Sequence, residues 1–174
     1  MEKIEVMISQ EKIDERVREL AAQINRDYEG REIHIICVLK GGVFFAVELA
    51  RYLTVPVTID FMSVSSYGND TKSSGVVKIV KDLDEPLQGK DVLVVEDIMD
   101  SGRTLSYLMN LLRDRKPASL RLCALLDKPD RRVIPVSVDY TGFQIEDKFV
   151  VGCGMDYRQR YRNLPYIGVV TLEE

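Results

Sequence analysis

One segment, residues 92–105 (VLVVEDIMDSGRTL), constrains the fold of this chain more than any other part of the sequence. Its apolar start, Val92–Val95, is mostly β-branched and predicts a strand that is buried on both faces. Two adjacent carboxylates, Glu96 and Asp97, follow at once, and a third, Asp100, precedes a small polar turn and an apolar-periodic helix. Strands buried on both faces belong to α/β proteins with a parallel sheet, so the segment predicts that class.

The carboxylates of this segment also predict a ligand. In open α/β sheets, ligands bind outside the carboxyl ends of the strands, where Glu96 and Asp97 stand. We expect the chain to turn after Val95, because the two side chains would point to opposite faces if both stayed in the strand. The turn residues Ser101, Gly102, Arg103 and Thr104 offer hydroxyls, backbone N–H groups and a helix N-terminus, which favour a phosphate.

The segment therefore predicts a sugar phosphate, with its hydroxyls or a bound metal at the acids. The plainer alternative is a solvated loop with two acids, and the buried strand beside them favours a functional site. Ser101 or Thr104 could equally be a plain helix N-cap, which is compatible with anion binding.

Composition limits the class of protein. The 174 residues suffice for one domain, and the net charge of −4 gives no footprint for nucleic acid or an acidic membrane surface. The three cysteines, Cys37, Cys123 and Cys153, are far apart and lie in apolar runs, so we expect reduced core thiols and a cytoplasmic protein. The first residues are too charged for a signal peptide, and no apolar run is long enough for a membrane span.

Strands and helices alternate along most of the chain. A helix is expected from Ser9 to about Tyr28, with Gly30 as its stop. The other expected elements are strands at 33–39, 55–64, 76–80, 91–95 and 120–126, and helices at 43–53 and 104–113. This order predicts a mostly parallel, twisted sheet flanked by helices. The polar stretch 63–74 is expected to be a lid, and the short strands after Asp127 a cap.

Several residues elsewhere could serve the same ligand. Lys40 and Gly41 follow another predicted strand and could contact phosphate, although a tight turn with a surface lysine is an equal alternative. Lys128 also follows a strand. Phe149 could stack on a flat heterocycle, while core packing is the commoner role of a lone aromatic residue. The basic and aromatic residues of 157–162 would ordinarily form a solvated face.

Other common sites are excluded by their missing residues. The pair Gly152 and Gly154 is not followed by the third glycine of a dinucleotide fingerprint, and no P-loop pattern occurs. His34 is the only histidine and stands in a predicted buried strand, which excludes catalytic triads and histidine-rich metal sites. Any metal must be held by oxygens, which indicates Mg²⁺.

Residues 94–104 resemble the phosphoribosyl-diphosphate (PRPP) motif of type I phosphoribosyltransferases. The similarity extends from about residue 10 to residue 172 and reaches the hypoxanthine/guanine branch of that family. Its further segments are LKGG at 39–42 (diphosphate loop), SSYG at 65–68 (lid), LLDK at 125–128, DKFVVG at 147–152 and DY at 156–157 (purine pocket), and YRNL at 161–164. Ser101 stands where threonine is commoner, and Arg103 occupies a variable position.

The resemblance implies an enzyme of purine salvage. It would transfer 5-phosphoribosyl from PRPP to N9 of hypoxanthine and guanine, giving IMP or GMP and diphosphate with the help of Mg²⁺. Glu96 and Asp97 would bind the ribose hydroxyls directly or through Mg²⁺, and residues 100–104 would hold the 5-phosphate. Asp100 would face N7 of the purine as general acid or base.

The resemblance also implies roles for residues outside that motif. Lys128 would donate to O6 of the purine, Phe149 would stack on the base, and the Val150 backbone would read its edge. Lys40, Gly41 and Arg162 would contact the diphosphate, with Asp156 helping to hold a second Mg²⁺. The lid would carry Ser66 and Tyr67 and exclude water. In this family the peptide bond before the position of Lys40 can be cis.

The expected organisation is a single phosphoribosyltransferase domain, 1–174, with a core of about 10–128. A small hood would comprise mainly 129–174 together with the N-terminal segment, and the protein would be a homo-oligomer, dimer or tetramer. Residues 151–156 leave guanine acceptance open. The alternatives are a xanthine-preferring or guanine-preferring relative, or a PRPP-sensing regulator of RNA or DNA, which the purine-pocket residues and the charge of −4 disfavour.

Overall fold

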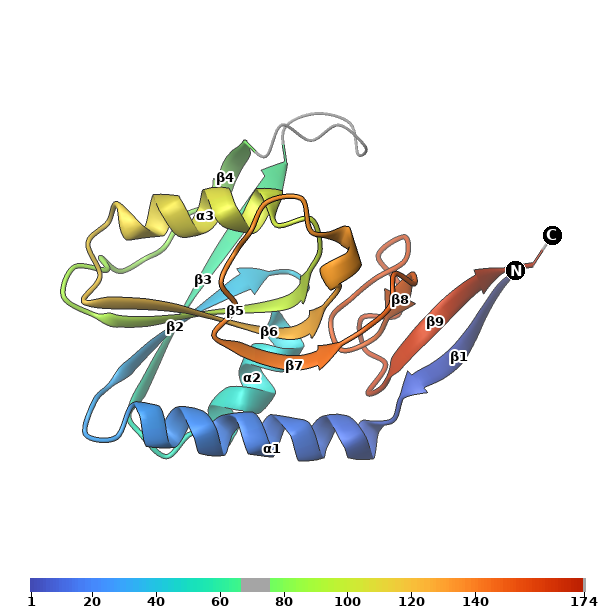
Figure 1. Cartoon of the computed structure of the whole chain (residues 1–174), viewed down its shortest axis with the longest axis horizontal. Helices are drawn as coiled ribbons and strands as arrows, with labels where there is room; N and C mark the ends of the chain where they lie inside the picture. The colour runs from blue at the N-terminus through green and yellow to red at the C-terminus, as the bar shows by residue number, and fades with distance from the viewer. Residues whose placement is uncertain (67–75, 174) are drawn as a thin grey trace.

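The computed structural model describes residues 1–66 and 76–173, which form two β-sheets and three α-helices (Figure 1). The larger sheet has six strands in the order β4-β3-β2-β5-β6-β7. These strands are β2 (Ile33–Leu39), β3 (Val57–Ser66), β4 (Val77–Lys81), β5 (Asp91–Met99), β6 (Ser119–Asp127) and β7 (Tyr140–Gln144). Only β4 is antiparallel to its neighbour within this sheet, so the predicted class, a mostly parallel sheet flanked by helices, is confirmed.

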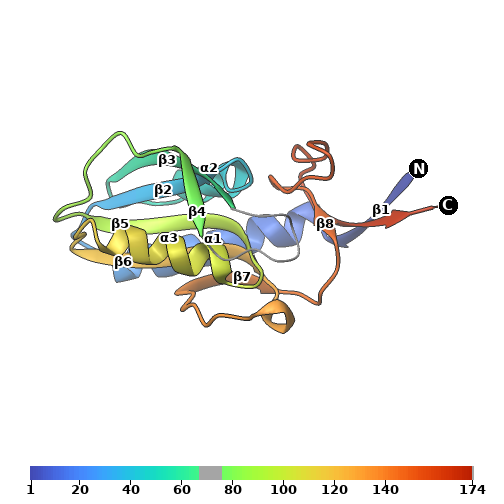
Figure 2. The ribbon, with the colours of Figure 1, turned by 90° about the horizontal axis from the view of Figure 1, so that it is seen from above.

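Helices cover both faces of the larger sheet (Figures 1 and 2). Helices α1 (Gln10–Asp27) and α2 (Val43–Arg51) lie on one face, and α3 (Arg103–Arg113) lies on the other. Helix α1 begins where predicted, with the Lys12 N–H donating to Ser9 Oγ at 3.3 Å, and buries the expected apolar stripe. Each face of the sheet thus has its own apolar core, which fixes the positions of the strand ends.

The strand at the centre of the sheet is longer than predicted. Residues 92–95 are fully buried as expected, but β5 continues to Met99 because its pairing with β6 continues through Glu96, opposite Ala124, and Ile98, opposite Leu126. The expectation that the chain turns after Val95 is therefore wrong. The turn comes only after Met99, so two of the three carboxylates are strand residues.

A second sheet of three strands is built from the two ends of the chain. Strand β1 (Glu2–Ile8) pairs antiparallel with β9 (Ile167–Leu172), which in turn pairs with the short β8 (Val150–Val151). The two termini therefore lie side by side (Figure 1). A short 3₁₀ turn, η1 (Pro129–Arg131), follows β6.

The larger sheet takes one strand from the segment expected to form the hood. Strand β7 lies within 129–174 but pairs in parallel with β6. The division into core and hood stays a prediction. Among the described residues, no helix is both long enough and apolar enough to cross a membrane.

Candidate active site

The carboxyl ends of β5 and β6 lie at two adjoining cavities. One cavity has a volume of about 470 Å³ and the other about 200 Å³. Asp97, Ile98 and Asp100 line both of them, so the three residues form the boundary between the two cavities. Lys128, at the end of β6, lines the larger one. The structure thus brings the three carboxylates of residues 92–105 and Lys128 together, because the carboxyl ends of parallel strands lie at the same edge of the sheet.

The smaller cavity is lined by Ser101 and Gly102 of the loop between β5 and α3, by Thr104 in the first turn of α3, and by Glu96. Gly102 is the N-cap of α3 and has a φ of 84°, a left-handed conformation that glycine adopts without strain. Ser101 is not the N-cap, but its Oγ accepts the Arg103 N–H at 3.3 Å. Backbone donors and a helix N-terminus that face a cavity suit a phosphate.

Of the stretch 63–74, expected to be a lid, the structure describes residues 63–66, which extend β3 and are therefore strand residues, contrary to the expected loop. Ser66 ends β3, and its Oγ lies 3.5 Å from Thr104 Oγ1, next to the loop between β5 and α3. Tyr67, the second residue predicted for the lid, lies outside the described residues. Arg103, the first residue of α3, is partly buried.

The two acids of β5 both line the smaller cavity despite the strand geometry. Glu96 Oε1 accepts the Asp97 N–H at 3.0 Å, and Asp97 Oδ1 accepts the Ile98 N–H at 2.7 Å. Burial and the neighbouring Asp97 carboxylate raise the pKa of Glu96 well above its ordinary value. A hydroxyl-bearing ligand or a cation would relieve this unfavourable pair, which indicates a binding site.

The donor set fits a magnesium ion that is shared with substrate. Within residues 1–66 and 76–173, no three acidic, histidine or cysteine side chains come close enough to form a metal site by themselves. Glu96, Asp97 and Asp156 therefore do not form one common cage. Mg²⁺ commonly binds through one or two carboxylates together with waters and substrate phosphates, and the Glu96–Asp97 pair provides that number of ligands.

The larger cavity combines a buried cation with an exposed aromatic ring. Lys128 is only 7% exposed, and its Nζ lies between the carboxylates of Asp100, at 3.9 Å, and Asp147, at 3.7 Å. Phe149 is 54% exposed and lines the cavity, so it is not a core residue. Its ring meets the Tyr157 ring edge to face, with centroids 5.8 Å apart. Val150 and Asp156 complete the predicted residues of this wall.

Lys40 and Arg162, which the resemblance assigns to the diphosphate, both donate hydrogen bonds to the side chain of Gln159. Gln159 Oε1 accepts from Lys40 Nζ at 3.2 Å and from Arg162 Nη2 at 3.0 Å. The Gln159 N–H donates to Asp156 Oδ2 at 2.8 Å, and Arg162 lies 3.5 Å from Asp156 Oδ1. Lys40, Asp156 and Arg162 are thus gathered at one place, as predicted. The peptide bond between Leu39 and Lys40 is cis.

Gly41 and Gly154 allow the segments that carry Lys40 and Asp156 to lie close to Asp97. A Cβ on Gly41 would collide with the Asp97 carboxylate, so the loop after β2 lies directly against Asp97. A Cβ on Gly154 would collide with the Gly41 carbonyl oxygen, and its φ is 100°. Gly154 requires glycine, because both its φ and a backbone oxygen oppose a side chain, whereas a side chain at position 41 would displace the Asp97 carboxylate.

Sequence reasoning gave no individual role to several residues of the site. Asp147, which pairs with Lys128, also lies 3.5 Å from Arg131, and Arg131 lines the larger cavity. Gln159 gave no signal in the sequence, since a glutamine in a polar turn is commonplace. Asp147 stands two residues before Phe149 and could have been noticed, because a carboxylate near a buried lysine is expected to pair with it.

Comparison with known proteins gives one consistent result. Residues 9–158 match the phosphoribosyl transferase domain. A Bacillus subtilis protein named hypoxanthine-guanine phosphoribosyltransferase is 50% identical over 165 residues, which cover 95% of this chain and 92% of that protein. A Salmonella typhimurium protein named hypoxanthine phosphoribosyltransferase is 50% identical over 171 residues, which cover 97% and 96%.

Longer proteins and solved structures are also similar. The chain spans 26% of the length of a Listeria monocytogenes protein named bifunctional protein TilS/HprT, with 51% identity over 168 residues. A crystal structure of a Bacillus anthracis hypoxanthine-guanine phosphoribosyltransferase, with a HEPES molecule in its active site, aligns with a TM-score of 0.94 and 51% identity. The alignment covers 97% of this chain and all of that one. The chain therefore belongs to the phosphoribosyl transferase family, within its group of hypoxanthine and hypoxanthine-guanine phosphoribosyltransferases.

Proposed function

We propose that this protein is a purine-salvage enzyme that transfers the 5-phosphoribosyl group of PRPP to N9 of hypoxanthine or guanine. The bond from ribose C1 to the diphosphate oxygen breaks, the bond from C1 to N9 forms, and the purine loses a proton. The strongest support is that the two cavities meet at Asp97, Ile98 and Asp100. The smaller one is lined by a loop that suits a phosphate, and the larger one by Lys128 and the exposed Phe149. The two substrates would meet where the cavities adjoin.

The smaller cavity is proposed to hold the ribose 5-phosphate. Ser101, Gly102, Arg103 and Thr104 would present backbone N–H groups, hydroxyls and the N-terminus of α3 to the phosphate. Glu96 and Asp97 would accept hydrogen bonds from the ribose hydroxyls, directly or through Mg²⁺. The raised pKa of Glu96 is in keeping with a carboxylate whose partner arrives with the ligand.

The larger cavity is proposed to hold the purine. Phe149 would stack on the ring, and Val150 would read its edge through the backbone. Lys128 would donate to O6, which a 6-amino group cannot accept, so 6-oxopurines would be favoured. Asp100, 3.9 Å from that ammonium, would exchange the proton of N7 as the purine attacks.

The diphosphate is proposed to leave toward Lys40, Gly41 and Arg162. Two cations on one side of the site would stabilise the charge that develops as the C1–O bond breaks. Mg²⁺, when bound, would supply further positive charge, with Asp156 as a carboxylate ligand of an ion at the diphosphate, separate from the ion that Glu96 and Asp97 would hold. Ser66 lies beside Thr104, at the phosphate loop, and Tyr67 is assigned to the lid from the sequence alone.

A substrate panel tests this proposal. The protein is incubated with PRPP, Mg²⁺ and, separately, hypoxanthine, guanine, xanthine, adenine or uracil, and nucleotide formation is followed. We expect turnover with hypoxanthine and guanine. Turnover with no base would refute the enzyme and leave the PRPP-sensing regulator, and turnover with xanthine or guanine alone would support the xanthine- or guanine-preferring alternative.

The role of Asp100 needs a separate measurement. We expect Asp100→Asn to lower kcat by about 10²-fold or more, as is common for a lost general acid or base. The affinity for PRPP, measured by calorimetry in the presence of Mg²⁺, should stay nearly unchanged because the phosphate and ribose contacts remain. An equal loss of PRPP binding would contradict the assignment.

Assembly and location belong to the same proposal. We infer a homo-oligomer, dimer or tetramer, in the cytoplasm. Helix α2 supports self-association, since Phe44, Val47 and nearby Tyr52 are each about two-fifths exposed on the surface. Light scattering at several protein concentrations measures the mass, and a monomer throughout would rule out the oligomer.

A further inference from the structure

A segment that follows η1, residues 132–134, lies against the loop between β5 and α3. The N–H groups of Val133 and Ile134 both donate to the Ser101 carbonyl oxygen, at 2.8 and 3.1 Å. A Cβ on Gly102 would collide with the Ile134 carbonyl oxygen and lie 3.1 Å from the Arg132 side chain. The phosphate-type loop is therefore supported from outside by a segment distant from it in sequence.

Arg132 extends this support to the main chain of Asp100. Its Nε donates to the Asp100 carbonyl oxygen at 3.1 Å, and its Nη2 forms a short hydrogen bond with Asp127 Oδ1. The Arg132 and Asp127 side chains are only 21% and 10% exposed, so solvent screens this ion pair little. Asp127 ends β6, and the next residue, Lys128, donates its N–H to the Met99 carbonyl oxygen at 2.9 Å.

Side-chain packing alone does not hold Asp100 in place. Its side chain is 48% exposed, and its carboxylate lies no closer than 3.9 Å to Lys128 Nζ. The position of the carboxylate therefore depends on the position of its backbone. Arginine suits this task because its planar guanidinium donates along fixed directions to two acceptors at once, which a lysine ammonium does not do in the same geometry.

We propose that Arg132 is a positioning residue, which, held by Asp127, fixes Asp100 and the loop 101–104 relative to Lys128. The proposal rests on the function proposed above. In that reaction a displacement of about 1 Å at the reacting groups costs on the order of 10²-fold in rate. Arg132 would thus act on turnover without touching either substrate.

The test compares Arg132→Met and Arg132→Lys with the wild-type protein in steady-state assays that vary PRPP and hypoxanthine. We expect Arg132→Met to lower kcat by about 10²-fold and to raise KM for PRPP, because both Asp100 and the phosphate loop lose their support. Arg132→Lys keeps the charge but not the paired hydrogen bonds, so it should recover only part of kcat.

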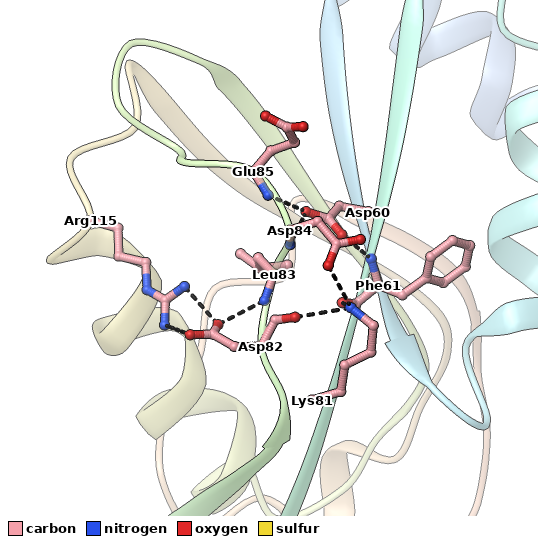
Figure 3. Close-up of polar contacts among 8 residues, drawn as sticks. All are labelled: Asp60, Phe61, Lys81, Asp82, Leu83, Asp84, Glu85 and Arg115. Atoms are coloured by element: carbon pink, nitrogen blue, oxygen red, sulfur yellow. Dashed lines mark hydrogen bonds and ion pairs between the residues drawn. The ribbon is translucent and has the colours of Figure 1, made fainter.

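Arg115→Met is the matched control. Arg115 makes the same kind of ion pair, with Asp82 at 2.8 and 3.1 Å, but neither residue lines the two cavities (Figure 3). This variant should keep the wild-type kcat and KM, and because its ion pair is more exposed, at 31% and 52%, it should lose less stability in urea unfolding than Arg132→Met. A role of Arg132 in stability alone would make the two methionine variants alike in their kinetics.

The outcomes separate the two proposals. Nucleotide formation by the wild type together with wild-type kcat and KM in Arg132→Met would overturn the positioning role and leave the enzyme function intact. An inactive wild-type protein would overturn the enzyme function and the positioning role with it. Should Arg132→Met not fold, Arg132→Lys and Asp127→Asn take its place, with lowered kcat supporting the role and unchanged kcat refuting it.

Discussion

Neutralising substitutions of two carboxylates in the larger sheet should change the free energy of unfolding in opposite directions. Asp60 in β3 is 3% exposed, and it accepts the N–H groups of Phe61, Asp84 and Glu85 at 2.8, 2.9 and 3.0 Å (Figure 3). Burial alone would raise its pKa, but these donors outweigh burial and the pKa is lowered. Glu96 in β5 has one backbone donor and a carboxylate neighbour, and its pKa is raised.

Glu96→Gln should therefore stabilise the protein, because it removes a poorly compensated charge and keeps the oxygen that accepts the Asp97 N–H. We expect a gain of about 1–3 kcal/mol in the free energy of unfolding at pH 8, the usual cost of a buried polar group short of partners. Asp60→Asn should lose about 2–3 kcal/mol, because hydrogen bonds to a charged group are among the stronger ones.

The pH dependence follows from the two pKa directions. The pKa of Glu96 is higher in the folded protein than in the unfolded chain. The ionisation of Glu96 therefore lowers the free energy of unfolding, by an amount that grows as pH rises above the unfolded pKa and reaches its full value above the folded pKa. The advantage of Glu96→Gln should thus disappear near pH 4. Asp60 contributes stability above its unfolded pKa, and this contribution is lost as pH falls through the folded pKa.

Urea unfolding of the three proteins between pH 4 and pH 8 measures these differences, and PRPP calorimetry with Mg²⁺ follows binding. Glu96→Gln should bind PRPP more weakly although it is more stable, which is the trade-off expected of a binding residue. A Glu96→Gln protein that is less stable than the wild type at pH 8 would show that the acid pair is structural and refute the reasoning.

Three further predictions concern selectivity, backbone geometry and thiols. Lys128→Ala should narrow the difference in kcat/KM between hypoxanthine and adenine, and an unchanged ratio would rule out its contact with O6. Gly154→Ala should lose about 2–4 kcal/mol in urea unfolding, since both a positive φ and a carbonyl oxygen oppose the methyl group, whereas Gly30→Ala, with a positive φ in open space, should lose only about 1 kcal/mol. Burial raises the pKa of Cys37 to about 12, so it should react with a thiol reagent at pH 8 only after unfolding, and rapid reaction in the folded protein would contradict its burial.

The larger sheet could be predicted because its signals are local. Val92–Val95 is apolar without interruption, Ile33–Leu39 is interrupted only by His34, and Ser9 and Gly30 mark the ends of α1. The end of β5 could not be predicted in this way. Glu96 and Asp97 interrupt the apolar run, yet the strand continues because the backbone pairs with β6, and backbone pairing leaves no trace in side-chain polarity.

The site was predictable where its residues stand in segments that resemble the family. Lys128 and Phe149 are assigned to the purine through the segments at 125–128 and 147–152, whereas the charge pairs around the site gave no signal in the sequence. Asp147 on Lys128 and Asp127 on Arg132 are charge pairs of a kind that many surfaces contain. Low exposure, 21% and 10%, distinguishes Arg132 and Asp127, and Asp147 is distinguished by its place in the larger cavity beside the buried Lys128. Both features depend on the tertiary fold.

The three-stranded sheet has a consequence for the order of folding during synthesis. Within the described residues, β1 and β8 pair only with β9, and β9 consists of residues 167–172. A ribosome makes β1 before β8 and β9, so this strand has no sheet partner until residues 167–172 have been translated. The six strands of the larger sheet precede β9 and can pair before it emerges. Val150 in β8, at the larger cavity, can therefore take its place in this sheet only after β9 has been made. A nascent chain would thus complete the smaller cavity, proposed for the phosphate, before the larger cavity, proposed for the purine.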